Sequence, residues 1–587
     1  MHRSAPALIL FASALASGCA SGAALGPGVG PDPPAARSGP SAPVADEATH
    51  GSERALAIRL VGAPEPEPFV RVEVRARGPA PELARFTVAE AAGARDFQAR
   101  DAAGALPVST TPDGTAIVLG RAASGEVELS YRVPGSFENE PLAVRVEPGR
   151  LKLTGERVLW LPEAFDARGV DVELALGTEP ASPPALVGAS SFGLGTSQRF
   201  RALGSELRHA AFVLGAGGQA ELVAPEGRDA AAWIGMTSFD PRPVVADVAA
   251  FRSAVGALLG EPDPTPTTYL LATEPLRRGE VQVIPRTAGA LVAVGLGQPW
   301  TGELRIALAT VVVQHWVGGR LWLGSPSPDP ASEAEAAWFT GGVARALARD
   351  LLFSFGLLTA DEYLREIGRL LDVAHASPLR ALGSAELARA FAADRAGPAL
   401  RLAIARGALY ASDVHARLRT ADPKSQGLPA LVRELLGRAR AAGGPLPVAS
   451  WLELVGARTG SDEAPAFARF VAEPRAPVLG PGTFGPCFRA APGRYPLFAL
   501  GLDAAASRAA HQVVGLDPTG PAARAGVRES EPLELLRFEA GRTDVEVELL
   551  LGRGAAPVTV RFVPLGGHVL GQVWSRVPGV PDERCTE

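Results

Sequence analysis

The sequence is poor in cysteine, and this scarcity limits the chemistry that it can carry. Only Cys19, Cys487 and Cys585 occur in 587 residues, and no two of them form a C-x-x-C pair. This excludes cysteine-rich zinc modules and thioredoxin-like redox motifs. No G-x-S-x-G or P-loop motif is present either, so neither a serine nucleophile elbow nor a phosphate-binding loop is indicated.

Histidine is also scarce and widely spaced. The eight histidines lie at positions 2, 50, 209, 315, 375, 415, 511 and 568, and none of them is followed by glutamate. No two are four residues apart, whereas a helix-borne zinc site needs two imidazoles at that spacing on one face. The sequence therefore has no H-E-x-x-H site, and we expect no cofactor.

The chain has no excess of positive charge. Its 57 lysines and arginines are outnumbered by 63 acidic residues, which gives a net charge of -6. This gives no reason to expect nucleic acid or an anionic membrane surface as a partner. At this length the chain is too long for a single core, so we expect several domains.

The N-terminus has the features of an export signal. The apolar residues 5–16 follow Arg3 and are too short to span a bilayer as a mature helix. Small residues lead into Cys19, so residues 1–18 resemble a bacterial lipoprotein signal, in which the cysteine is acylated and anchors the chain to a membrane. An ordinary secretory signal cleaved nearby is the alternative. Ala20 is not the aspartate that retains such proteins at the inner membrane, so the resemblance implies the outer membrane, with the chain facing the periplasm or the cell surface.

The rest of the chain divides into four segments. Residues 19–52 are rich in glycine, proline and small residues, which predicts a disordered tether. Residues 53–180 contain runs such as F-V-R-V-E-V-R-A at 69–76, whose alternation predicts an antiparallel β domain. Residues 181–475 become mainly helical, and residues 476–587 return to strands and glycine turns. We therefore expect an α+β multidomain protein.

Four short segments follow one another in the helical region. They read W-V-G-G-R at 316–320, W-F-T-G-G at 338–342, R-G-A-L at 406–409 and D-V-H-A-R-L at 413–418. In this order they resemble the glycyl aminopeptidase family of zinc metallopeptidases, in the thermolysin-like gluzincin group. Each family motif is only partly matched. The resemblance implies an N-terminal β domain, a thermolysin-like domain and a C-terminal PDZ domain.

The same resemblance implies where the zinc site would lie, and the required residues are missing there. The first histidine ligand falls on Thr310, the catalytic glutamate on Val311, the second histidine on Gln314 and the glutamate ligand on Gly341. None of these offers an imidazole or a carboxylate. His315 could be a leftover ligand or an independent base. Without a nucleophile or partner in view, a polar group at the edge of a packed apolar helix is the favoured interpretation.

The segment 511–538 resembles the core of a protease-associated PDZ domain. Upstream of it, Leu500, Gly501 and Leu502 resemble the loop whose backbone amides capture a peptide carboxylate. This resemblance implies that peptide or protein C-termini are possible partners at a PDZ-like groove. The alternative is that the module only packs against the helical domain.

These observations leave two hypotheses for function. The first is a lipid-anchored protein without catalytic activity that binds peptides or proteins or acts as a scaffold. The second is an active metalloaminopeptidase with a noncanonical site. With Cys19 acylated, the remaining Cys487 and Cys585 would meet an oxidising compartment, so we expect them to form a disulfide around the PDZ-like module.

Overall fold

The computed structural model describes residues 54–586 with short gaps. The gaps are 65–66, 91, 137–142, 180–185, 225–226, 236, 264, 277–281, 326–329, 394–396, 474–476 and 554–555. The expected signal peptide, the tether and the acylation site Cys19 lie outside the described residues. Ser52–Glu587 form one compact unit. No helix in the described part of the chain is long and apolar enough to cross a membrane.

A seven-stranded sheet opens the folded part. Its order is β15-β12-β1-β2-β8-β4-β5. The strands are β1 (Ala55–Ala63), β2 (Phe69–Arg77), β4 (Arg95–Asp101), β5 (Gly104–Leu106), β8 (Val127–Pro134), β12 (Gly169–Thr178) and β15 (Ser197–Leu203). In β2, Val70, Val72 and Val74 are buried while the charged residues between them are more exposed, as the alternating sequence predicts. The expected antiparallel pairing holds except between β1 and β12, which are parallel. The intervening strands supply the long connection that a parallel pair needs.

Two smaller sheets share one apolar core with the first. The order of one is β14-β13-β16-β10-β9 and that of the other is β11-β3-β7-β6. Their strands are β3 (Arg85–Thr87), β6 (Val108–Thr110), β7 (Ala116–Leu119), β9 (Arg145–Glu147), β10 (Arg150–Thr154), β11 (Leu161–Pro162), β13 (Val187–Ser190), β14 (Gly193–Leu194) and β16 (Ala211–Gly215). Leu56, Ile117 and Phe212, one from each sheet, lie in that core. Because β15 and β16 pair with β12 and β10, these sheets continue to Gly215, past the expected boundary at residue 180.

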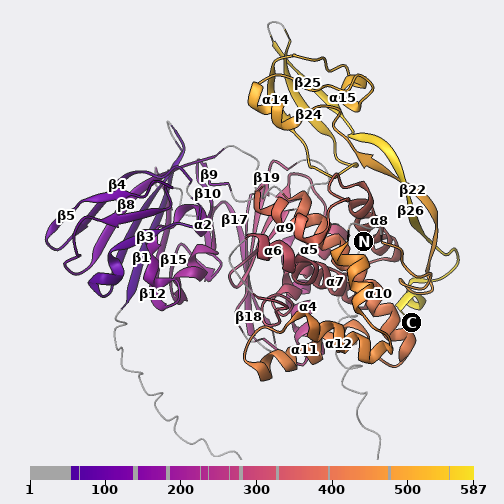
Figure 1. Ribbon diagram of the computed structural model, residues 1–587. Coiled ribbons are helices and arrows are strands. Elements are labelled where there is room, and N and C mark those ends of the chain that lie inside the picture. The colour runs from indigo at the N-terminus through magenta and orange to yellow at the C-terminus, as the bar shows by residue number, and fades with distance from the viewer. Residues whose placement is uncertain are drawn as a thin grey trace, which may run out of the picture. The chain divides into compact units, whose positions relative to one another are not determined.

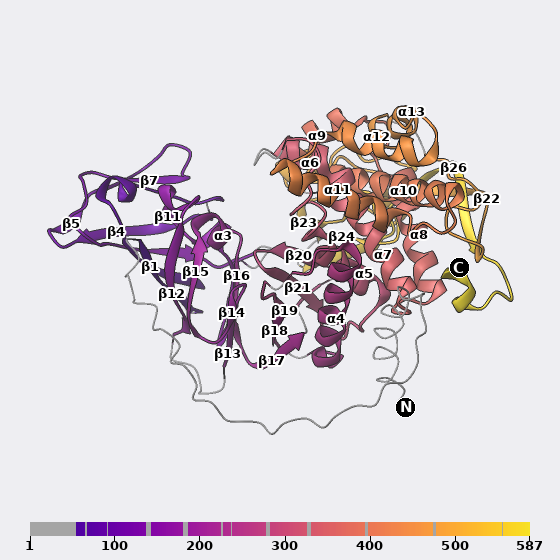
Figure 2. The same ribbon diagram turned by 90° about the horizontal axis from the view of Figure 1, so that it is seen from below.

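A mixed five-stranded sheet follows and supports the first long helices. Its order is β17-β18-β19-β21-β20, with β18, β19 and β21 parallel to one another. The strands are β17 (Gly217–Ala224), β18 (Gly227–Ile234), β19 (Thr268–Glu274), β20 (Gln282–Arg286) and β21 (Gly289–Gly295). The helices α4 (Pro241–Leu259) and α5 (Gly302–Gln314) contact this sheet and each other (Figure 2).

Helices then dominate, as the sequence predicts. They are α6 (Pro330–Ala337), the π-helical turn η3 (Trp338–Val343), α7 (Ala344–Ser354), α8 (Ala360–Ala376), α9 (Ser384–Ala393), α10 (Pro398–Ala421), α11 (Leu428–Ala442), α12 (Val448–Thr459), α13 (Ala464–Phe467) and the π-helical turn η4 (Ala468–Ala472). Thr359 and Glu362 form a capping box at the start of α8. Gly260, Gly443 and Gly460 end α4, α11 and α12 in the left-handed conformation that glycine adopts at low cost.

The C-terminal part is a two-stranded ribbon that carries a small module at one end (Figure 1). The ribbon strands are β22 (Phe488–Phe498) and β26 (Leu565–Arg576). Between them lie α14 (Ala504–Ala510), α15 (Pro521–Arg524), β23 (Leu533–Arg537), β24 (Val547–Arg553) and β25 (Ala556–Phe562). The module has its own core around Val513 and Leu549. In contrast, Phe488 and Trp574 of the ribbon belong to the core of the helical part.

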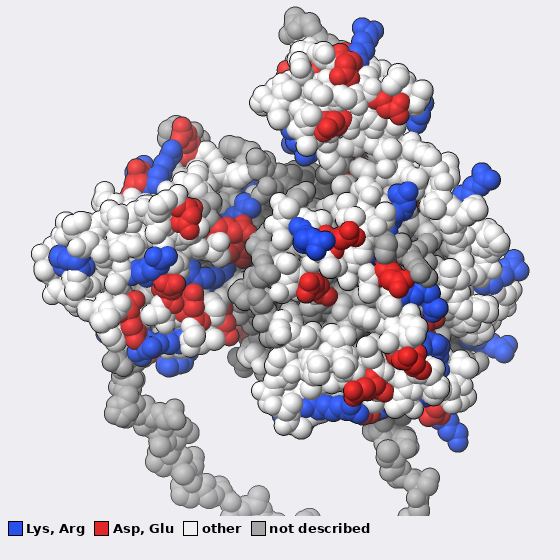
Figure 3. All heavy atoms as spheres, viewed as in Figure 1, with Lys and Arg blue, Asp and Glu red and all other residues white. Residues whose placement is uncertain are grey.

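Charges of the two signs are interspersed on the surface. On the face shown in Figure 3, basic and acidic side chains are interspersed and large areas carry neither. Partly exposed ion pairs such as Arg71–Glu179 and Arg100–Glu128, both at 2.8 Å, occur in the protein. Such pairs contribute little to stability. The face shows no continuous basic stripe of the kind that tracks a nucleic-acid backbone.

Candidate functional site

The end of α5 packs against η3, which brings the two tryptophan-containing segments together. Trp316 is fully buried and its Nε1 donates to the carbonyl of Glu261 at 3.0 Å. Gly318 has φ of 105°, and a Cβ there would lie 3.0 Å from the side chain of Thr340. Gln314 Nε2 donates to the carbonyl of Thr340, also at 3.0 Å. The positions that the family resemblance assigns to a zinc site are therefore neighbours in space.

The side chains on α5 at this place are used by the fold. Thr310 is buried, and its Oγ1 donates to the carbonyl of Ile306 one turn earlier at 2.6 Å. Val311 packs against the apolar core of the helical part. The amide of Gln314 is held by η3. Where the family resemblance implies two imidazoles and a carboxylate, the chain has a hydroxyl bonded to its own helix, an amide and an alkyl group.

The η3 side of the site is closed by α10. A Cβ on Gly341 would lie 2.6 Å from Cγ1 and 2.9 Å from Cδ1 of Ile404, closer than such atoms approach in proteins. At the next residue, a Cβ on Gly342 would lie 2.7 Å from the Cα of Gly407. Gly407 itself lies against the backbone of Trp338. Ile404 thus occupies the space beside position 341 that a glutamate side chain would need.

These residues do not fit the zinc ion that the family resemblance implies. Zinc sites in proteins use imidazole, thiolate or carboxylate ligands, and catalytic ones keep three of them on the protein. Thr310, Gln314 and Gly341 supply none. Among all the residues that the structure describes, no group of three or more histidine, cysteine, aspartate or glutamate side chains could hold a metal ion.

His315 belongs to a cluster of charges that the sequence did not reveal. Its Nε2 lies 2.7 Å from Oδ2 of Asp263. Asp263 also pairs with Arg252 and Arg320, at 2.6 and 2.8 Å, and Arg252 reaches the buried Asp229 at 2.9 Å. Burial lowers the pKa of His315, and the nearby Asp263 opposes this only in part. At neutral pH the imidazole is therefore uncharged, and the cluster ties the segment after α4 to the end of α5.

The loop of Leu500, Gly501 and Leu502 lies at the junction of the ribbon and the module. Leu500 is buried in the core of the module, and Gly501 has φ of 79° and abuts Pro521. The carbonyl of Gly501 accepts from the amide of Asp517 at 2.8 Å. In the described part of the chain, no acceptor is found for the amides of Leu500, Gly501 and Leu502. The residues that follow form α14, whereas addition of a peptide as a neighbouring strand would need an extended segment there.

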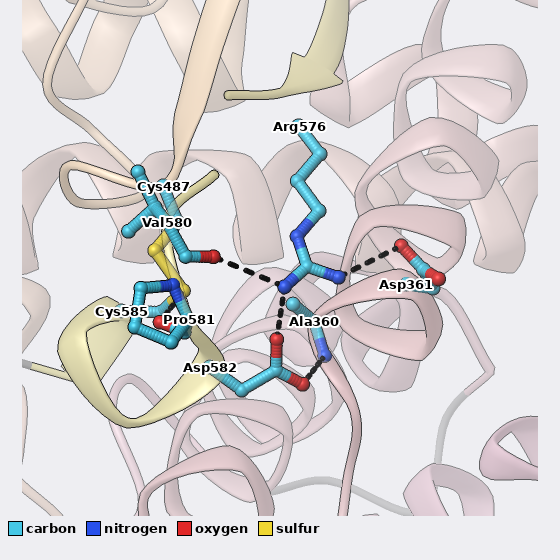
Figure 4. Close-up of a disulfide and its surroundings, with 8 residues drawn as sticks. All are labelled: Ala360, Asp361, Cys487, Arg576, Val580, Pro581, Asp582 and Cys585. Atoms are coloured by element: carbon cyan, nitrogen blue, oxygen red, sulfur yellow. Dashed lines mark hydrogen bonds and ion pairs between the residues drawn. A yellow bond between two sulfur atoms is a disulfide. The ribbon is translucent and has the colours of Figure 1, made fainter. Parts of the chain in front are cut away.

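A disulfide closes the base of the ribbon. Cys487 lies just before β22 and Cys585 lies after β26, and the two are bonded with Cα atoms 5.1 Å apart. Figure 4 shows how the C-terminal segment is fixed beside them. Asp582 pairs with Arg576 and accepts from the amide of Ala360 at 3.1 Å, which ties the segment to the first turn of α8.

Comparisons with known proteins bear on the fold. No family model and no curated protein sequence matches the chain. The solved structure of an aminopeptidase N family protein from Idiomarina loihiensis matches with a TM-score of 0.63 and 13% identity, over 90% of this chain and 99% of that chain. An M1 zinc metallopeptidase from Deinococcus radiodurans matches with a TM-score of 0.46 and 14% identity, over 73% of this chain and 94% of that chain, a likeness too weak to add weight. The chain therefore has an aminopeptidase N-like fold, in which N-terminal β sheets, a helical part and C-terminal β sheets follow one another.

Proposed function

We propose that this protein is an aminopeptidase-like protein without catalytic activity, anchored by lipid at Cys19 in a bacterial cell envelope, where it binds peptides or proteins or acts as a scaffold. One observation carries the proposal. At Gly341, where the family resemblance places the glutamate ligand, Ile404 fills the adjacent space. Restoring one ligand would require the packing of η3 against α10 to change.

The residue that the family resemblance places at the general base supports the same proposal. In zinc peptidases a carboxylate takes the proton from the zinc-bound water. The corresponding residue, Val311, has no titratable group and packs against the core. His315 lies beside Asp263, and among the described residues no metal-binding group accompanies it that could supply a zinc-bound water.

We further propose that peptide C-termini bind at the loop of Leu500, Gly501 and Leu502. Three consecutive amides without an acceptor suit a carboxylate, since oriented backbone N–H groups form anion-binding concavities. Because α14 follows the loop, the ligand would be held mainly through its terminal carboxylate rather than along a strand.

Two assays on residues 52–587 test these proposals separately. Cleavage of aminoacyl substrates is measured with and without added zinc, and chelator-sensitive turnover would contradict the absence of catalysis. For the loop, calorimetry compares peptides that have free or amidated C-termini.

Substitutions provide the matched control for the loop. Gly501→Ala and Gly526→Ala both place a side chain at positive φ in the same module, but only position 501 is crowded by Pro521. We expect binding to need the free carboxylate and to weaken only with Gly501→Ala. Equal binding of amidated peptides, or an equal effect of both substitutions, would rule out the loop.

A further inference from the structure

His375 is a buried histidine at the junction of α8 and the C-terminal ribbon. It lies near the end of α8 and is only 2% exposed. Its ring stacks on that of Tyr495 of β22, with the ring centroids 4.6 Å apart and the planes 15° from parallel. Gly571 of β26 packs against the edge of the imidazole, because a Cβ at this glycine would lie 2.8 Å from Nε2. The imidazole therefore joins the helix to both strands of the ribbon.

Neither ring nitrogen of His375 has a hydrogen-bond partner in the described part of the chain. The hydroxyl of Tyr495 is already used, since it donates to the carbonyl of Gln572 at 2.6 Å. A neutral imidazole leaves one donor and one acceptor unsatisfied, whereas the protonated ring has two unsatisfied donors and a positive charge. Burying a charge without a partner costs far more than burying a neutral polar group. Protonation of His375 is therefore unfavourable as long as the ribbon covers the ring.

No charged group compensates for a proton on this ring. Burial lowers the pKa of His375, and no neighbouring charge opposes the effect. The charged and titratable side chains on the elements around it are exposed or have other partners. They are Asp372 of α8, which accepts from Thr543, Arg406 of α10, which donates to the carbonyls of Leu382 and Arg380, the exposed Arg494 and His568 of the ribbon, and the pairs Arg542–Asp544 and Arg401–Glu539.

We propose that His375 is an acid-sensitive contact, which holds the ribbon on α8 while its ring is neutral and releases the ribbon when the ring takes up a proton. Once the ring is released, water can accept from both of its N–H groups. The base of the ribbon stays attached through the Cys487–Cys585 disulfide and the pair of Arg576 with Asp361 at 3.5 Å. Release therefore concerns the part of the ribbon that leads to the module, and it does not depend on the function proposed above.

The direction and size of the effect follow from linkage. A released imidazole titrates near pH 6.5 and the docked one has a lower pKa, so docking is favoured above this pH and weakens as the pH falls through it. If the docked ring stays neutral, the population of released ribbon rises about tenfold between about pH 7.5 and 5.5. Asp372 acts in the opposite direction, because burial raises its pKa to about 6 in the folded protein.

Hydrogen exchange followed by mass spectrometry tests the proposal on residues 52–587, which form one compact unit. Exchange is measured at about pH 7.5 and 5.5 and corrected for the intrinsic dependence of amide exchange on pH. Because a two-stranded ribbon is only marginally stable alone, its amides should exchange when it leaves α8. Peptides that cover β22 and β26 report this release, and peptides that cover β1 and β2 are the reference for the rest of the fold.

One substitution isolates the contribution of the histidine. His375→Gln replaces the titrating ring by a neutral polar side chain of similar length. Opening of the ribbon in the unsubstituted protein, divided by that in this variant, should rise about tenfold between the higher and the lower pH. Asp372 is present in both proteins, so its contribution cancels. His568→Gln is the matched control, because His568 is exposed on β26, and this variant should keep the pH dependence of the unsubstituted protein.

A pair of glycine substitutions tests the contact without a change of pH. Gly571→Ala places a methyl group against the edge of the imidazole and should increase exchange of the ribbon already at the higher pH. Gly567→Ala is its control on the same strand, because nothing lies within 4 Å of the Cβ that would be added there. This variant should leave the ribbon protected.

Three outcomes would overturn the proposal. These are a ratio of the unsubstituted protein to His375→Gln that does not change with pH, a His568→Gln variant that loses the pH dependence as His375→Gln does, or equal protection of the ribbon in Gly571→Ala and Gly567→Ala. If His375→Gln does not fold, Asp372→Asn takes its place. Without the opposing carboxyl, the ribbon should open about tenfold more at the lower pH relative to β1 and β2, and an unchanged ribbon would refute the proposal.

Discussion

Gly341 is the residue at which the packing between η3 and α10 can be measured directly. Alanine at this position would place its Cβ 2.6 Å from Cγ1 of Ile404. Overpacking of this kind typically costs about 1–3 kcal/mol. Against this, alanine is favoured over glycine inside a helix by about 1 kcal/mol. We therefore expect Gly341→Ala to destabilise the protein by about 0–2 kcal/mol.

The sign should reverse when the neighbour is shortened. In an Ile404→Ala background the contact is removed, so the same substitution should stabilise by up to about 1 kcal/mol. The coupling between the two positions is then about 1–3 kcal/mol, within the range found for residues in contact. The assay is urea unfolding of residues 52–587, with the change in midpoint compared at constant m.

Two further glycines serve as controls. Gly437 is an exposed residue of α11, and nothing lies within 4 Å of the Cβ that would be added there, so Gly437→Ala should stabilise in both backgrounds. A Cβ on Gly342 would meet the backbone of Gly407, so Ile404→Ala should not rescue Gly342→Ala. The reasoning is refuted if Gly341→Ala shifts the midpoint equally with and without Ile404.

Three other predictions concern the rest of the chain. The non-reduced, denatured protein should contain no free thiol at Cys487 or Cys585, and two free thiols would contradict the pairing. Reduction should lower the melting temperature, because a closed loop of about 100 residues contributes up to about 4.7 kcal/mol to stability in the chain-entropy model. Burial raises the pKa of Asp372, which accepts from Thr543, to about 6. Since this folded-state pKa lies above the unfolded one, the free energy of unfolding should fall as the pH rises from about 4 to 6. Urea unfolding measured across this pH range should show that Asp372→Asn makes the dependence on pH less steep. An unchanged pH dependence would count against the prediction. Mass spectrometry of the mature protein should find Cys19 acylated at the new N-terminus, and an unmodified start would exclude the lipid anchor.

Local patterns in the sequence predict the local elements well. The alternation in β2 depends on neighbours along the chain, and it appears as expected. The order of β, helical and β parts follows from the same patterns. The parallel pairing of β1 with β12 could not be predicted from these patterns, because the alternation in a strand carries no information on the direction of its partner.

The sequence pointed to Thr310, Val311, Gln314 and Gly341 only through the family resemblance. It could show that Gly341 is no ligand, but not that Ile404 fills the adjacent space, because that contact joins segments far apart in the chain. The same holds for the pairing of His315 with Asp263. Buried charges have no periodic signal, and their partners emerge only from the tertiary fold.

Metal content tests the central claim most directly. The full-length protein, purified without chelator and dialysed against metal-free buffer after loading with zinc, is analysed by inductively coupled plasma mass spectrometry. Because Thr310, Gln314 and Gly341 supply no imidazole or carboxylate, we expect far less than one zinc ion per chain. A value near one zinc per chain, lost together with aminopeptidase activity on treatment with a chelator, would contradict the account.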